Sequence, residues 1–148
     1  MENDAAAQLA AINDTRSAVA DRLITPWWYH PALGTALAVY VVGLSLGNTA
    51  VRLATVAVFV AFCVVLTRTY RRMTGVWVSG ADAKGVAGRW ATAMGAMVGV
   101  IAIAGWLIGA YTDLDWPVWC LAVVVLAGTI VLGRRFDAAL RAQLRAAA

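Results

Sequence analysis

Side chains that could do acid–base or metal chemistry are few in this sequence. His30 is the only histidine, and it lies between two prolines in residues 25–34, TPWWYHPALG. A histidine can act as a general base near neutral pH or as a metal ligand. The two cysteines, Cys63 and Cys120, fall in different apolar segments and are expected at different depths, so they are predicted to be packing residues and not a disulfide. A zinc site needs about four ligands brought together. We therefore predict no metal and no cofactor.

Few acidic residues are placed where they could act as a catalytic acid or base. Asp113 and Asp115 share a short polar connection, and the sequence has no nucleophile elbow and no paired carboxylates on a common helix face. An enzyme of lipid metabolism with Asp113, Asp115 or His30 as its base is a minor alternative. The prediction is that the protein is not an enzyme.

The elements that position these residues are set by hydrophobicity. Of the 148 residues, 62% are hydrophobic and only 14% are charged, and the mean hydropathy is +0.75. A soluble domain of this size needs a more polar exterior. The composition is typical of a membrane protein.

Four apolar segments approach the roughly 20 residues that a helix needs to cross a bilayer. Helices are expected because a spanning segment must satisfy its own backbone hydrogen bonds. The fold class predicted is an all-α polytopic membrane protein with four transmembrane helices, at about residues 31–48, 50–67, 90–111 and 116–133. An amphipathic arm helix is predicted over residues 1–26, the transmembrane domain over 27–133, and a basic tail over 134–148.

The basic residues favour one orientation. All but one of the 12 Lys and Arg residues lie in the arm, the middle loop and the tail, and the exception is Arg52. Positive residues stay on the cytoplasmic side of membrane proteins. Both termini are therefore predicted to be cytoplasmic, in a multi-pass protein of the inner (plasma) membrane.

Aromatic residues gather at the expected membrane interfaces, where amphipathic rings are stable. Pro31 is tolerated in the first turn of a helix, so TPWWYHPALG is interpreted as the entry to the first span, with His30 at the interface. A pH-sensing or ligand-contacting role for His30 is the alternative. The predicted interface anchors are Trp27, Trp28, Tyr29, His30 and Trp90 on the inner side, and Trp116 and Trp119 on the outer side.

Small residues recur at helical spacing in the third segment, and two GxxxG pairs occur among them. Such residues let transmembrane helices approach closely. They indicate either packing within the chain or an oligomer interface, and both readings stay open. The residues concerned are Gly43 and Gly47 in the first segment, and Ala91, Gly95, Gly99, Ala102, Gly105 and Gly109 in the third.

These observations favour a non-enzymatic membrane protein that acts through helix packing and protein–protein contacts, as an accessory, scaffold or regulatory subunit. Its partners would be membrane lipids and either a second copy or another membrane or cytoplasmic protein. No nucleic-acid-binding motif accompanies the basic residues, so no nucleic-acid partner is predicted. The alternative is a small transporter or channel subunit for an apolar or amphiphilic solute. No ionisable residue at mid-depth supports proton-coupled transport.

With TPWWYHPALG, RRMTGVWVSG and four apolar segments in view, the chain resembles small uncharacterised four-helix membrane proteins of high-GC actinobacteria. The resemblance implies a helical arm leading into the first span and a location in the membrane. It carries no activity over to this chain.

Overall fold

The described part of the chain is all helical. The computed structural model describes residues 8, 11, 25–75 and 83–146, which contain no strand. They form four long helices: α2 (Tyr29–Leu46), α3 (Thr49–Thr74), α4 (Gly85–Tyr111) and α5 (Trp116–Ala146). Each is long and apolar enough to cross a membrane. The prediction of a helical, multi-pass membrane protein is confirmed to that extent, whereas most of the predicted arm lies outside the described residues.

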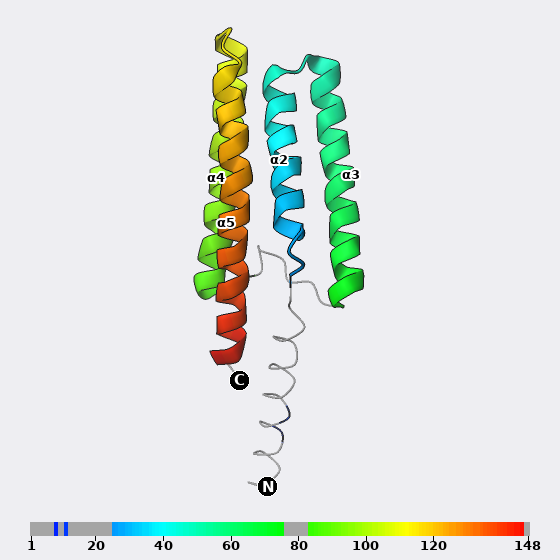
Figure 1. Ribbon diagram of the computed structural model, residues 1–148, viewed down its shortest axis with the longest axis vertical. Helices are drawn as coiled ribbons and strands as arrows, with labels where there is room; N and C mark the ends of the chain where they lie inside the picture. Colours follow the sequence, from blue (N-terminus) through cyan, green and yellow to red (C-terminus); the bar gives the residue numbers. More distant parts are fainter. Residues whose placement is uncertain (1–7, 9–10, 12–24, 76–82, 147–148) are drawn as a thin grey trace.

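The helices run antiparallel in sequence order, and the α2–α3 and α4–α5 connections lie at the same end of the molecule (Figure 1). The side chain of Asn48 caps α3 by accepting a hydrogen bond from the Val51 amide at 3.0 Å. Gly75 ends α3 in the left-handed region at φ 68°, a conformation that suits glycine. Short connections join α2 to α3 (residues 47–48) and α4 to α5 (residues 112–115).

Three helices extend beyond the segments marked by hydropathy. The second segment was predicted to end near residue 67, but α3 continues to Thr74. Similarly, α4 begins at Gly85, and α5 runs 31 residues to Ala146. At about 1.5 Å per residue, α5 measures roughly 46 Å, well over the roughly 30 Å hydrocarbon core. Hydropathy marks where a helix can meet lipid, and arginine, a good helix former, carries the helix further.

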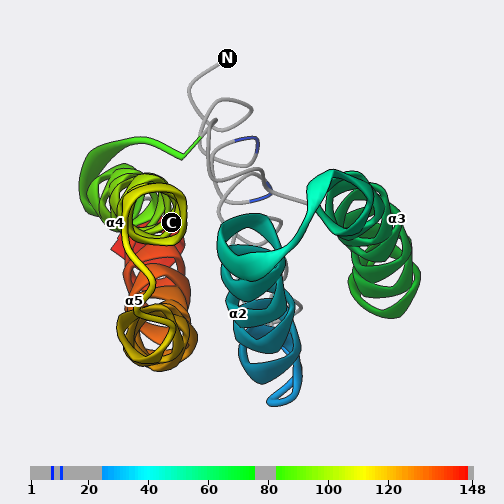
Figure 2. The ribbon, with the colours of Figure 1, turned by 90° about the horizontal axis from the view of Figure 1, so that it is seen from above.

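Helix α2 is the central element. It packs against α3, α4 and α5, and α4 packs against α5. Viewed along the helices, α3 lies on one side of α2 and the α4–α5 pair lies on the other (Figure 2). The buried hydrophobic cluster lies between α2 and this pair, and contains Leu37, Val41, Ile101 and Val125.

The contact between α2 and α5 uses one narrow face of each helix. Buried positions recur every three or four residues on both, which is the spacing of a single helix face. On α2 these are His30, Gly34, Leu37, Val41 and Ser45. On α5 they are Val118, Ala122, Val125 and Thr129.

Glycines set the closest approaches between helices. A Cβ added at Gly34 would lie 3.0 Å from the carbonyl oxygen of Leu126 in α5. A Cβ at Gly109 would clash with the backbone carbonyl of Ser45 in α2. By contrast, a Cβ at Gly95, on the same helix as Gly109, would meet nothing within 4 Å.

The two α4 glycines provide a matched test of this packing. Gly109→Ala is expected to destabilise the protein by about 1–3 kcal/mol, because a methyl group is forced against backbone that cannot rotate away. Gly95→Ala is expected to be neutral or to stabilise by up to about 1 kcal/mol, since alanine is the better helix former. Reversible unfolding in mixed micelles measures both. Equal effects of the two substitutions would show that α2 and α4 do not approach at Gly109.

Candidate functional site

The most polar contact in the described structure joins the start of α2 to the far part of α5. His30 Nε2 lies 2.7 Å from Asp137 Oδ2, and the two side chains are 9% and 16% exposed. An ionised carboxylate only accepts hydrogen bonds, so Nε2 donates the proton in this pair. Asp137 is the one acidic residue in the described part of α5. The hydrogen bond therefore joins α2 to α5 through two residues that lie 107 positions apart in the sequence.

Gly133 makes room for the histidine ring. It lies one helical turn before Asp137, so both residues occupy the same face of α5. A Cβ at Gly133 would clash with the His30 ring at Nδ1. His30 Nδ1 is buried and has no hydrogen-bond partner among the described residues. The ring is thus held between a glycine and a carboxylate, with its free nitrogen against the glycine backbone.

Aromatic rings cover the other side of His30. The ring of Tyr29 meets that of His30 edge-on, with centroids 5.3 Å apart. It also lies 5.2 Å from the ring of Tyr70 near the end of α3. The Tyr70 hydroxyl is 3.5 Å from the Thr25 hydroxyl, which precedes α2. Residues of TPWWYHPALG therefore contact α3 on one side and α5 on the other.

This cluster joins side chains of α2, α3 and α5. It brings one histidine and one carboxylate together, and the described ranges contain no group of three or more possible metal ligands. Both cysteines are free, with Cys120 exposed and Cys63 partly buried. The arrangement can act as a clamp, made of His30, Asp137, Tyr29 and Tyr70, that holds the first turn of α2 against the C-terminal parts of α3 and α5.

Sequence reasoning placed His30 at the membrane interface but missed its partner. Hydropathy is a local property and cannot predict a contact between residues 107 positions apart. A signal was nevertheless present, because Asp137 is a lone acid among the arginines of the tail and follows Gly133 at helical spacing.

The predicted small-residue positions divide into two groups. Gly105 and Gly109 lie against Ser45 of α2, and Gly43 lies against Thr55 of α3. Gly47 ends α2, where its amide donates to the Gly43 carbonyl at 3.2 Å. Ala91 and Ala102 are partly buried. Gly95 and Gly99 are exposed, and a Cβ at either would meet nothing within 4 Å.

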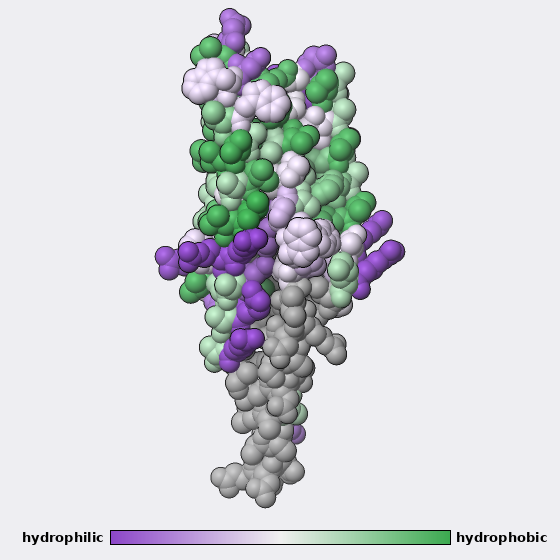
Figure 3. All heavy atoms as spheres, in the orientation of Figure 1, coloured by the Kyte–Doolittle hydropathy of each residue, from purple (hydrophilic) through white to green (hydrophobic). Residues whose placement is uncertain are grey.

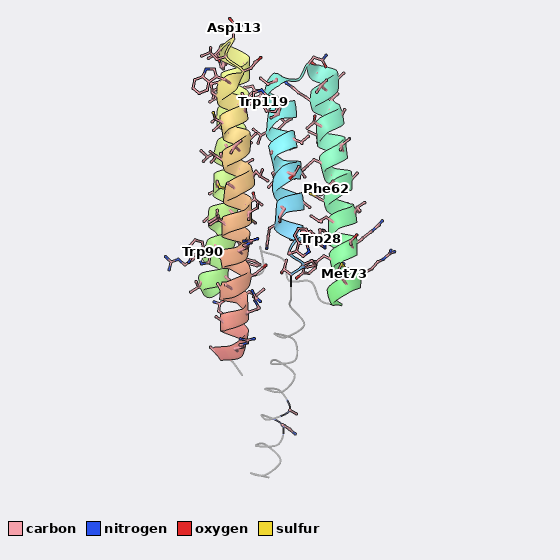
Figure 4. All side chains as sticks on the ribbon, in the orientation of Figure 1. Trp28, Phe62, Met73, Trp90, Asp113 and Trp119 are labelled. Atoms are coloured by element: carbon pink, nitrogen blue, oxygen red, sulfur yellow. The ribbon has the colours of Figure 1, made fainter. Side chains whose placement is uncertain are left out.

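The predicted interface aromatics lie at both ends of the helices. Trp28 and Trp90 are found at the end where α2 and α4 begin, and Trp119 lies towards the opposite end, where Asp113 is located (Figure 4). Trp27 is 82% exposed, whereas Trp28 and Trp90 are partly buried. Trp116 and Trp119 are both exposed. Exposed indole rings at these two levels suit the boundaries between lipid and water.

One open groove of about 440 Å³ follows the flank of α3. Its described lining is apolar along Phe59, Cys63 and Val64 and turns polar at Arg68 and Arg71. The ring centroid of Phe59 also lies 4.6 Å from that of Tyr40 in α2, with the ring planes tilted by 36°. Sequence reasoning did not single out this face of α3. Apolar residues in the middle of a membrane helix are common, and so are arginines near its end.

Comparisons with known proteins offer no assignment for these features, since no protein-family model, curated protein or solved structure matches the chain.

The His30–Asp137 contact can be measured with a double-mutant cycle. His30→Ala and Asp137→Ala are each expected to destabilise the protein, and together by less than their sum. The expected coupling is about 1–2 kcal/mol, because the hydrogen bond is charge-assisted and nearly buried. Unfolding in mixed micelles gives the values, with the exposed Asp113→Ala as the control. Strict additivity of the two substitutions would exclude the clamp.

Proposed function

We propose that this is a non-enzymatic integral membrane protein of the inner (plasma) membrane that works by helix association, as an accessory, scaffold or regulatory subunit. Its first partner is a second copy of the same chain. The observation that carries the proposal is the exposed glycine pair Gly95 and Gly99 on α4, because a Cβ at either would meet nothing within 4 Å.

The position of this pair on α4 supports an external interface. Gly105 lies six positions after Gly99, which places the two residues about 120° apart around a helix. Gly105 is buried against α2, whereas Gly99 is exposed. The stripe of small residues therefore turns from the inside of the molecule to its outer surface along α4.

Small residues on the outside of a membrane helix favour association. Lipid tails are as apolar as the helix, so hydrophobicity alone does not bring two helices together in a bilayer. Close packing of backbones does, and a GxxxG pair permits it. Around Gly99, the exposed side chains of Ala96 and Thr92 are also small. Two α4 helices that cross at this face would gain contacts that lipid does not supply.

We also propose that both termini are cytoplasmic. The described ends of α3 and α5 and the start of α4 carry most of the basic residues, and Asp113 and Asp115 lie at the opposite end. Hydrophilic side chains project near the start of α2, with hydrophobic surface between them and the other end (Figure 3). The excess of arginine supports a cytoplasmic location for that end.

Single cysteines test the orientation. In a Cys63→Ser/Cys120→Ser background, Asp115→Cys is expected to react with a membrane-impermeant maleimide in intact spheroplasts. Arg141→Cys is expected to react only after the membrane is permeabilised. The reverse labelling pattern would place the termini outside.

Leucines on the glycine face test the association. Wild-type protein is expected to form dimers in liposomes, measured by single-molecule photobleaching over a range of protein-to-lipid ratios. Gly95→Leu/Gly99→Leu is expected to weaken the dimer by at least about tenfold, because the added side chains separate the backbones.

Ala93→Leu is the matched control, since it adds the same side chain at an exposed position about 160° away from Gly95 on α4. It is expected to dimerise like the wild type. A wild-type protein that stays monomeric at every ratio, or equal effects of the glycine and alanine variants, would contradict the proposal.

A further inference from the structure

The open groove on the flank of α3 is apolar over part of its length and basic at one end. Its described lining runs from Phe59 to Arg71. At about 1.5 Å per residue this is roughly 18 Å, close to the hydrocarbon thickness of one leaflet, which is about half of the roughly 30 Å core. Its volume of about 440 Å³ is within the usual range for small-molecule sites.

The polarity of the groove changes along its length. Phe59, Cys63 and Val64 line the part towards the middle of α3, and Thr67, Arg68 and Arg71 line the part near its end. A molecule that matches this order has an apolar chain and an anionic head. An acyl chain with a phosphate group has this chemistry, and arginine is suited to phosphate through its planar fork of donors.

The two arginines are available for such a head group. Among the described residues, neither Arg68 nor Arg71 has an acidic partner, since Asp137 is bound to His30 and the other two described acids, Asp113 and Asp115, lie at the opposite end. Arg72, which follows directly, is exposed but does not line the groove. The positive charges of Arg68 and Arg71 therefore line the polar end of the groove, whereas that of Arg72 lies outside it.

We infer that the flank of α3 binds one anionic phospholipid, with an acyl chain along Phe59, Cys63 and Val64 and the phosphate between Arg68 and Arg71. A second copy of the chain fits this face less well, because it would bring arginines against arginines. The inference does not depend on association through α4.

Photo-reactive lipids provide the test. Phosphatidylglycerol and phosphatidylcholine with a diazirine in one acyl chain are incorporated at equal, low levels into phosphatidylcholine liposomes that contain the full chain. Cross-linked peptides are quantified by mass spectrometry. The anionic lipid is expected to label the α3 segment 59–71 on the order of tenfold more than the zwitterionic lipid, because each arginine near the surface adds to the attraction.

Two pairs of variants distinguish a site from general attraction to a basic surface. Arg68→Gln/Arg71→Gln is expected to reduce labelling by phosphatidylglycerol to the level of phosphatidylcholine. Arg72→Gln/Arg89→Gln removes the same charge outside the groove and is expected to leave it unchanged. Val64→Trp is expected to reduce labelling by both lipids several-fold by filling the groove, whereas Val65→Trp, at the exposed next position, is not.

Equal labelling of the wild type by the two lipids would overturn the inference. So would equal losses in the two arginine pairs, which would indicate surface charge alone. Uniformly low labelling of α3 would also overturn it, as expected if another segment of the chain or a second copy covered the groove.

Discussion

Close approach of backbones around α2 is the constraint on which the rest of the structure depends. In a bilayer, apolar side chains gain little by leaving lipid for a neighbouring helix, so contact must come from dense packing and from polar groups satisfied between helices. Helix α2 meets both conditions. Gly34 faces α5 and Gly43 faces α3, while His30 of α2 is hydrogen-bonded to Asp137 of α5 at 2.7 Å. The other three helices are arranged around these short contacts.

Different kinds of interaction stabilise the two ends of α2. At its C-terminal end, Gly105 and Gly109 of α4 lie against Ser45, and packing alone acts there. At its N-terminal end, His30 bonds Asp137 and Tyr29 packs on Tyr70. The carboxylate is tolerated there because it stays 16% exposed beside the first turn of α2. In mid-bilayer the same pair would carry a much larger desolvation cost.

Much of this architecture could be predicted from the sequence because hydropathy is a local property. Runs such as ALGTALAVYVVGLSLG reveal a spanning helix without knowledge of its neighbours. The end of α3 was predicted less well, since the apolar run stops near residue 67 whereas the helix continues through Arg71 to Thr74. Which helix lies beside which, and which face each helix turns to its neighbour, could not be predicted from the sequence. The Gly43–Gly47 and Gly95–Gly99 pairs have the same spacing, yet Gly43 faces α3 and Gly95 faces open space. Only the rotation of each helix, which depends on all its contacts, distinguishes them.

The central place of α2 also separates the two outer surfaces. The exposed glycine pair lies on α4 and the groove lies on α3, and Figure 2 shows α2 between those helices. A second copy bound through α4 would therefore leave the flank of α3 facing lipid. Both surfaces still depend on α2, because the His30 end of that helix contacts α5 directly and α3 through Tyr29. The clamp at His30 therefore positions α3 and α5 from the same end of α2.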